Sequence, residues 1–87
     1  MPNLTMKARD KLLILLGQRI KQKRRELKMK QEELAEKTGL HRTYVSDVEL
    51  GKRNLGFCIV VSIALALNTT VSELATGIEQ FFPLRRN

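Results

Sequence analysis

The sequence has little cysteine and no long hydrophobic run. Cys58 is the only cysteine, so neither an intramolecular disulfide nor a cluster of thiolate metal ligands can form. This cysteine usage, together with the lack of a secretory signal peptide, predicts a protein of the reducing cytoplasm. The longest apolar run covers residues 12–16, far less than the ~20 residues that a membrane span needs. We therefore expect no segment that crosses a bilayer and no partner embedded in a membrane.

Aromatic residues and helix breakers are also scarce. Three Phe and one Tyr, with no Trp, predict a core built from aliphatic side chains. The only prolines, Pro2 and Pro83, lie near the two ends of the sequence. No stretch alternates apolar and polar residues for long enough to indicate a strand. We expect a compact all-α fold with a single domain over residues 1–87.

The positive charge is concentrated in the first third of the sequence. The formal net charge is +7, and residues 1–30 hold ten Lys or Arg against two acids, Asp10 and Glu26. This distribution favours a polyanionic partner, either nucleic acid or an acidic membrane. The alternative is a charged face that is merely solvated.

Five stretches carry apolar residues at helical spacing. The predicted helices cover residues 5 or 8 to 27, 31–38, 42–50, 56–67 and 71–82. The apolar face of the first is expected to comprise Leu13, Leu16, Ile20 and Leu27. Lys30 is a poor N-cap, so we expect the second helix to fray at its start. The T-x-x-E spacing of Thr70 and Glu73 predicts a capping box at the start of the fifth.

The segment QEELAEKTGLHRTYVSDVEL, residues 31–50, carries the most informative pattern. Two short helices that cross steeply need a small residue at their contact, and Ala35 supplies it. The tight turn between them calls for a positive φ, which Gly39 adopts without a steric penalty. We expect Leu34 and Leu40 to cover the inside of this corner. The residues packing back from the third helix are expected to be Val45 and Val48.

With this motif the sequence resembles the lambda-repressor-like helix-turn-helix family, also called Cro/C1 or XRE-type. The resemblance runs from Leu16 to Leu74 and includes LGQRIKQKRRELKMKQEELAEKTGLHRTYVSDVELGKRN. It implies a five-helix domain in which the second helix of the motif enters the DNA major groove. The segment RTYVS followed by GKRN is also similar to the controller proteins of restriction-modification systems.

Four polar side chains share one side of the predicted third helix. With 3.6 residues per turn they fall within an arc of roughly 140°, opposite Val45 and Val48. Arg42 could bind guanine O6 and N7, or contact a phosphate, or stay solvated. Asp47 could accept a hydrogen bond from cytosine N4, or orient Arg42 instead. The predicted base-reading residues are Arg42, Thr43, Ser46 and Asp47.

The resemblance also implies phosphate contacts around that helix. Gln31 begins a helix that rests on the DNA backbone in the family, where its amide and free main-chain N–H groups can meet a phosphate. Tyr44 could donate its hydroxyl to a phosphate, or pack against the second helix. The turn GKRN lies beside the DNA backbone in relatives, and it could also serve as a plain capping turn. The predicted phosphate-binding residues are Gln31, Tyr44, Lys52, Arg53 and Asn54.

The resemblance further implies one structural pair. In the family an arginine late in the first helix pairs with a glutamate late in the third, and Arg24 and Glu49 occupy these positions. Such a pair would fix the angle of the reading helix.

One reading helix covers few base pairs, so the resemblance implies a homodimer on a (pseudo)palindromic operator, with two helices ~34 Å apart. The family pattern makes Phe57 a core residue and leaves surplus apolar residues on the fourth helix. The alternative is a fourth helix covered by residues 12–16. We predict a dimerisation region over residues 56–84. Its interface residues are predicted to be Ile59, Leu65, Ile78, Phe81 and Phe82.

Two other classes of function fit the sequence less well. A single histidine, His41, and a single cysteine form no catalytic triad and no paired metal ligands, so we predict no enzyme, metal, cofactor or small-molecule ligand. An antitoxin that masks a partner protein could use the same fold. We therefore predict a sequence-specific regulator that binds double-stranded DNA, with an antitoxin that also binds its own promoter as the alternative.

Overall fold

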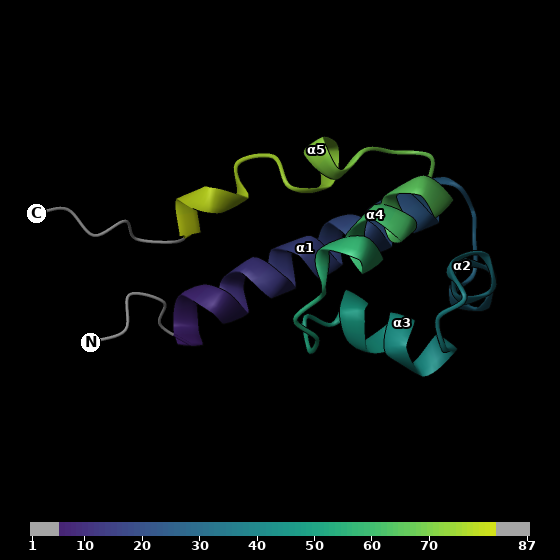
Figure 1. Cartoon of the computed structure of the whole chain (residues 1–87), viewed down its shortest axis with the longest axis horizontal. Coiled ribbons are helices and arrows are strands. Elements are labelled where there is room, and N and C mark those ends of the chain that lie inside the picture. The colour runs from purple at the N-terminus through teal and green to yellow at the C-terminus, as the bar shows by residue number, and fades with distance from the viewer. Residues whose placement is uncertain (1–5, 82–87) are drawn as a thin grey trace, which may run out of the picture.

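The computed structural model describes the backbone of residues 6–81 and the side chains of residues 8–80 (Figure 1). Over this part the chain forms five α-helices, one short 3-10 helix and no strand, which confirms the predicted all-α fold. The elements are α1 (Met6–Glu26), α2 (Gln31–Thr38), α3 (Arg42–Glu49), α4 (Phe57–Ala66), α5 (Val71–Leu74) and the 3-10 helix η1 (Ile78–Phe81). The longest helix, α1, packs against α3, α5 and η1.

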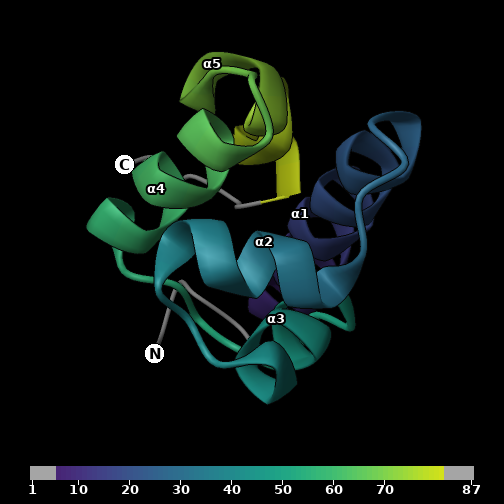
Figure 2. The same cartoon turned by 90° about the vertical axis from the view of Figure 1, so that its right-hand side faces the viewer.

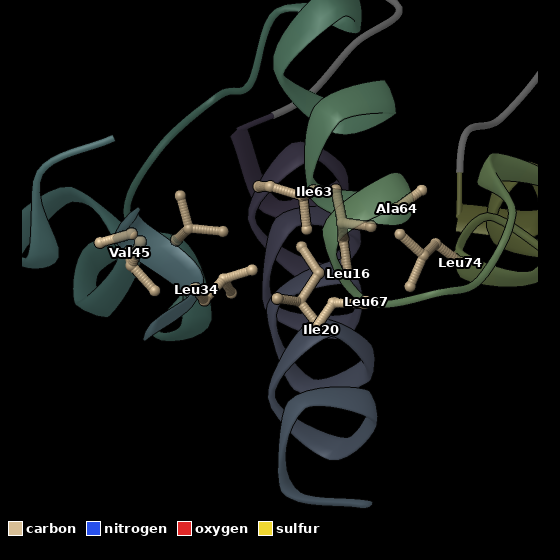
Figure 3. Packing of buried hydrophobic residues seen from close by; sticks show 10 residues of the cluster. Leu16, Ile20, Leu34, Val45, Ile63, Ala64, Leu67 and Leu74 are labelled. Atoms are coloured by element: carbon tan, nitrogen blue, oxygen red, sulfur yellow. The ribbon is translucent and has the colours of Figure 1, made fainter. Parts of the chain in front are cut away.

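The core lies where side chains of α2, α3, α4 and α5 converge beside α1 (Figure 3). Leu16 and Ile20 project from α1 into this cluster, and Leu13 is also buried, as the helical spacing predicts. Every fully buried large side chain in the described residues is aliphatic, in agreement with the scarcity of aromatics. These side chains are Ile20, Leu34, Val45, Ile63, Leu67 and Leu74.

Leu27 does not belong to the apolar face of α1, contrary to the prediction. Its side chain is 46% exposed. The helix ends one residue earlier, and Lys28 adopts a left-handed φ of 55°. The N–H of Leu27 still donates to the carbonyl oxygen of Lys23 at 3.2 Å, and that of Lys28 donates to the carbonyl oxygen of Arg25 at 2.9 Å. Leu27 therefore lies in the closing turn at the end of α1, where its side chain is not covered.

The starts of two helices are stabilised by carboxylate and hydroxyl groups. The Lys30 side chain caps nothing, and the Glu33 carboxylate instead accepts the N–H of Lys30 at 2.9 Å. At α5 the hydroxyl of Thr70 accepts the N–H of Glu73 at 3.0 Å, so this half of the predicted capping box is present. A second hydroxyl, that of Thr69, donates to the Glu73 carboxylate at 2.7 Å and lowers the pKa of this group.

The predicted fifth helix over residues 71–82 is wrong in its length. α5 ends at Leu74, and η1 follows after a turn in which Gly77 has a φ of 69°. The Arg19 guanidinium donates to the Leu74 carbonyl oxygen at 2.8 Å, while the Ile78 N–H turns to the carbonyl oxygen of Ala75 at 3.1 Å. The left-handed turn at Gly77 carries the chain out of the helix, and the Arg19 side chain satisfies the Leu74 carbonyl oxygen that is left without a helical partner.

In the described part of the chain, no single helix has the length and apolar character to cross a membrane. Only α4 taken together with residues 71–80 reaches that length and composition, and the two segments are bent by 104°. Between residues 6 and 81 no group of three or more His, Cys, Asp or Glu side chains could hold a metal ion.

Candidate nucleic-acid interface

α2 and α3 form a steep corner on one side of the molecule, which faces the viewer in Figure 2. Gly39 joins them with a φ of 75°, and its N–H donates to the carbonyl oxygen of Ala35. Leu34 and Ala35 are buried on the inside of the corner, and Leu40 packs against the core. The left-handed turn, the small contact residue and the apolar lining all lie where the motif predicts them.

The two sides of α3 differ in burial. Val45 and Val48 are 1% and 3% exposed and face the core. The polar side carries two exposed residues, Arg42 and Thr43, and two partly exposed ones, Ser46 and Asp47. At the start of the helix the Nδ1 of His41 accepts the N–H of Thr43 at 3.2 Å, so the imidazole replaces the usual small polar cap.

Glu49 anchors the C-terminal end of α3 to the rest of the fold. Its carboxylate accepts two hydrogen bonds from Arg24, at 2.6 Å from Nε and 3.0 Å from Nη2. The Arg24 and Glu49 side chains are only 11% and 2% exposed, so this is a buried bidentate ion pair. The hydrogen bonds that Arg24 donates to Glu49 raise the pKa of Arg24. The ion pair implied by the family resemblance is therefore present in the structure.

Gln31 extends this pair towards the outward face of α3. Its Nε2 donates to the Glu49 carboxylate at 3.0 Å, and its Oε1 accepts from the Arg42 guanidinium at 3.4 Å. Gln31 does begin α2, as predicted, but its amide has partners within the protein on both sides. The hydrogen bond between Gln31 and Glu49 could not be predicted from the sequence, because only the tertiary fold brings residues 31 and 49 together.

A second polar cluster lies at the other end of the outward face and consists of Tyr44, Asp47 and Arg53. The Arg53 guanidinium contacts Oδ2 of Asp47, at 3.3 Å from both Nε and Nη2. It also stacks over the Tyr44 ring at 5.0 Å from the centroid. Tyr44 is partly buried and packs against the core, which agrees with the alternative of a packing role. The partner that the structure gives Asp47 is Arg53 rather than Arg42.

The turn after α3 exposes three polar residues, one of which, Arg53, belongs to this cluster. Gly51 has a φ of 78°, and its N–H donates to the carbonyl oxygen of Val48 at 3.0 Å. The N–H of Lys52 donates to the carbonyl oxygen of Asp47 at 2.9 Å, so the two bonds complete a Schellman motif. The capping role considered for this turn is therefore present. The exposed residues that it presents are Lys52, Arg53 and Asn54.

Close contact between α1 and α3 sets the position of this whole surface. Gly17 lies where the helices cross, and a Cβ there would come within 2.7 Å of the carbonyl oxygen of Glu49 and closer still to that of Val48. A Cβ on Gly51 would meet the backbone of Ile14 at 2.8 Å. The backbones of α1 and α3 therefore touch directly.

A corner of two short helices, with a glycine turn and one polar face, is the arrangement of a helix-turn-helix motif. The family model described as helix-turn-helix matches residues 20–74, which include α2, α3, α4 and α5. The chain belongs to the helix-turn-helix family.

Several relatives of this helix-turn-helix protein are named as control proteins. Control protein C.SmaI of Serratia marcescens is 40% identical over 62 residues, which cover 71% of this chain and 74% of that protein. The structure of the restriction-modification controller protein C.AhdI from Aeromonas hydrophila is 39% identical, covers 71% of this chain and 94% of that chain, and superposes with a TM-score of 0.70. A tetramer of the controller protein C.Esp1396I, solved in complex with its natural 35 base-pair operator, is 33% identical with a TM-score of 0.69, and the match covers 80% of this chain and 92% of that chain.

The helix-turn-helix protein exposes apolar residues along one side of α4. Phe57, Val61 and Leu65 recur every four residues, and Phe57 and Leu65 are 71% and 74% exposed. Phe57 was predicted in the core, and that prediction is wrong because the residue occupies the open first turn of the helix. Ile59 and Ile78, predicted at an interface, are partly buried against the protein's own core. The predicted interface residue Phe82 and the side chain of Phe81 lie outside the described residues.

The N-terminal half of α1 reaches part of α4, as the alternative to an open helix supposed. Leu12 and Leu16 lie with Phe57 and Val60 around an apolar groove of about 220 Å³. Leu65, two turns further along α4, does not line this groove and points elsewhere. Some residues near the start of α4 therefore border α1 across this groove, and in the later part of the helix Leu65 is exposed whereas Ile63 and Ala64 are buried.

Proposed function

We propose that this chain is a sequence-specific regulator of transcription that binds double-stranded DNA and places α3 in the major groove. The observation that carries this proposal is the division of α3 into a core face and a polar face that projects away from the fold. A helix that presents hydrogen-bonding groups on a protruding ridge can reach base edges in the major groove. We assign the base contacts to Arg42, Thr43, Ser46 and Asp47.

Phosphate contacts on both sides of that ridge would fix the register of the protein on the duplex. The N-terminus of α2 offers free main-chain N–H groups beside Gln31, although the Gln31 amide itself already holds Glu49 and Arg42. The turn after α3 offers exposed Lys52, Arg53 and Asn54, with Tyr44 at its inner edge. The excess of positive charge favours association with DNA of any sequence.

Two single substitutions distinguish a base contact from a phosphate contact. Arg42→Ala is expected to lower affinity for the preferred site by about 1–3 kcal/mol and to relax preference at one base-pair position. Lys52→Ala is expected to weaken binding to all duplexes alike and to reduce the salt slope by about one. Both are measured by fluorescence anisotropy with a duplex selected from a random pool and with single-base variants of it. Equal effects of Arg42→Ala on every duplex would remove Arg42 from the base-reading set.

We further propose that the protein acts as a homodimer on a (pseudo)palindromic site, joined through the exposed side of α4 that carries Leu65. Leu65 is 74% exposed on a helix whose opposite side is buried, and a second copy would cover it. Leu65→Glu is expected to weaken self-association at least about 30-fold, because a charge would enter the apolar contact. Sedimentation velocity measures the change. The matched control is Leu27→Glu, which alters another exposed leucine outside α4 and is expected to leave the dimer intact.

The relatives named as restriction-modification controllers favour one biological setting. We propose that this protein controls the genes of such a system from the cytoplasm, without a cofactor and without catalysing a reaction. A footprint on the DNA upstream of its own gene tests this proposal, since it gives the site, its symmetry and the half-site spacing together. A protected site with no twofold symmetry would contradict the dimeric arrangement.

A further inference from the structure

The cluster of Tyr44, Asp47 and Arg53 joins residues that the proposed function assigns to different parts of the DNA. Asp47 stands on the face of α3 that reads bases, whereas Arg53 follows in the turn that would meet phosphate. In the structure without DNA both Nε and Nη2 of Arg53 lie 3.3 Å from the same oxygen of Asp47. The two groups must therefore separate if Asp47 is to offer this oxygen to a base and Arg53 is to turn these two nitrogens to a phosphate.

The surroundings of the pair leave it free to exchange partners. The Arg53 and Asp47 side chains are 49% and 27% exposed, so solvent screens their attraction and weakens it. The guanidinium also rests on the ring of Tyr44, which is itself held against the core. The Schellman motif fixes the backbone between Asp47 and Lys52, so Arg53 stays near both the aromatic ring and the DNA-facing side.

Separating the pair next to DNA has a cost that depends on what replaces Arg53. A carboxylate left without a positive partner would face the phosphate groups at close range and be repelled by them. A cytosine amino group in the major groove is a donor that can take the place of the guanidinium on Asp47. Arg53 can therefore separate from Asp47 without leaving the carboxylate unpaired only on a duplex that has a cytosine at the matching position.

We propose that Asp47 is a specificity-determining residue that makes the contact between Arg53 and phosphate conditional on the base sequence. On a matching site, Asp47 accepts from cytosine N4, and Arg53 moves to a phosphate oxygen. On other DNA, Arg53 stays paired with Asp47, and neither group adds to affinity. This inference rests on the proposed function and adds to it a mechanism for rejecting wrong sites.

The test compares two duplexes and three variants of the full chain. The duplexes are the one selected by the wild-type protein from a random pool and a scrambled version of the same composition. Asp47→Asn is expected to bind the scrambled duplex about five- to tenfold more tightly than wild type, because Arg53 becomes free to contact phosphate. The dependence of log affinity on log salt for that duplex should steepen by about one.

Arg53→Ala tests the exchange without altering α3. It is expected to weaken binding to the selected duplex at least tenfold. Binding to the scrambled duplex should weaken only about threefold, since there the loss comes from the unpaired Asp47 carboxylate alone. Lys52→Ala, the matched control one residue earlier in the same turn, is expected to weaken both duplexes by the same factor. Equal losses for Arg53→Ala on both duplexes would overturn the inference and leave the proposed function standing. A wild-type protein that does not distinguish the duplexes would overturn both.

A second measurement uses the protein without DNA. Tyr44 is the only tyrosine, so tyrosine ring signals in a tyrosine-labelled sample belong to this residue alone. Asp47→Asn is expected to shift the NMR signals of the Tyr44 ring and of the Arg53 Nε–H, while the signals of α1 stay in place. Unchanged signals at both groups would show that the pair does not persist in solution, which also overturns the inference.

Discussion

Replacing Glu49 by alanine is expected to lower the free energy of unfolding by about 3–5 kcal/mol. The substitution removes the partner of a buried arginine, and Arg24 would keep its charge with only the carbonyl oxygen of Met29, 2.7 Å away, to accept from it. Gln31 would lose its acceptor at the same time. Because small domains are stable by only about 5–15 kcal/mol, the loss is a large part of the total. Urea denaturation followed by circular dichroism measures it.

The size of this loss reflects an uncompensated charge more than the strength of the pair. The double variant Arg24→Met with Glu49→Leu, which leaves no buried charge, is therefore expected to be more stable than Glu49→Ala alone. Glu36→Ala, a change of an exposed glutamate on α2, is the matched control and should alter stability by no more than about 0.5 kcal/mol. A double variant that is less stable than Glu49→Ala would contradict this explanation.

Gly17→Ala is expected to destabilise the fold by about 3 kcal/mol, although alanine is the better helix former. The new methyl group would lie within 2.7 Å of a carbonyl oxygen in α3, and backbone atoms there cannot move aside as a flexible side chain would. The helices must separate, which tilts the reading face of α3 relative to the rest of the domain. Affinity for the selected duplex should therefore fall together with the midpoint of urea unfolding.

The same substitution at another glycine supplies the control for this prediction. Gly56 is the N-cap of α4, and an added Cβ there meets no described heavy atom within 4 Å. Gly56→Ala should cost less than about 1 kcal/mol, a capping effect alone. If Gly17→Ala were as mild as Gly56→Ala, the close approach of α1 and α3 would not hold in solution.

The sequence predicted the motif well because its signals are local. Ala35 and Gly39 lie four residues apart, and their roles follow from helix spacing and from backbone freedom. The surroundings of the end of α5, by contrast, include a contact between distant parts of the chain. At the end of α5 the Leu74 carbonyl oxygen accepts from Arg19, which is 55 residues away in the sequence. No pattern within residues 71–82 signals that bond.

In the candidate site, too, the sequence predicted local features but not the contacts that the tertiary fold creates. The polar face of α3 could be assigned from its period, and Arg24 with Glu49 from the family resemblance. The links from Gln31 to Glu49 and from Arg53 to Asp47 span 18 and 6 residues and cross a turn. The packing of the elements decides which of several nearby polar groups become partners. Residue spacing alone therefore left Asp47 with more than one possible role.

The inward half of α3 carries the groups that hold the helix in place, namely two valines and Glu49. Its outward half contributes nothing to the core, and Thr43 and Ser46 in particular stand apart from the buried ion pair. Exchanging outward residues should therefore redirect the protein to a different operator at little cost in folding. Such a division lets recognition diverge between relatives while one scaffold is retained, and it marks positions 43 and 46 as the first to vary in a library built for new targets.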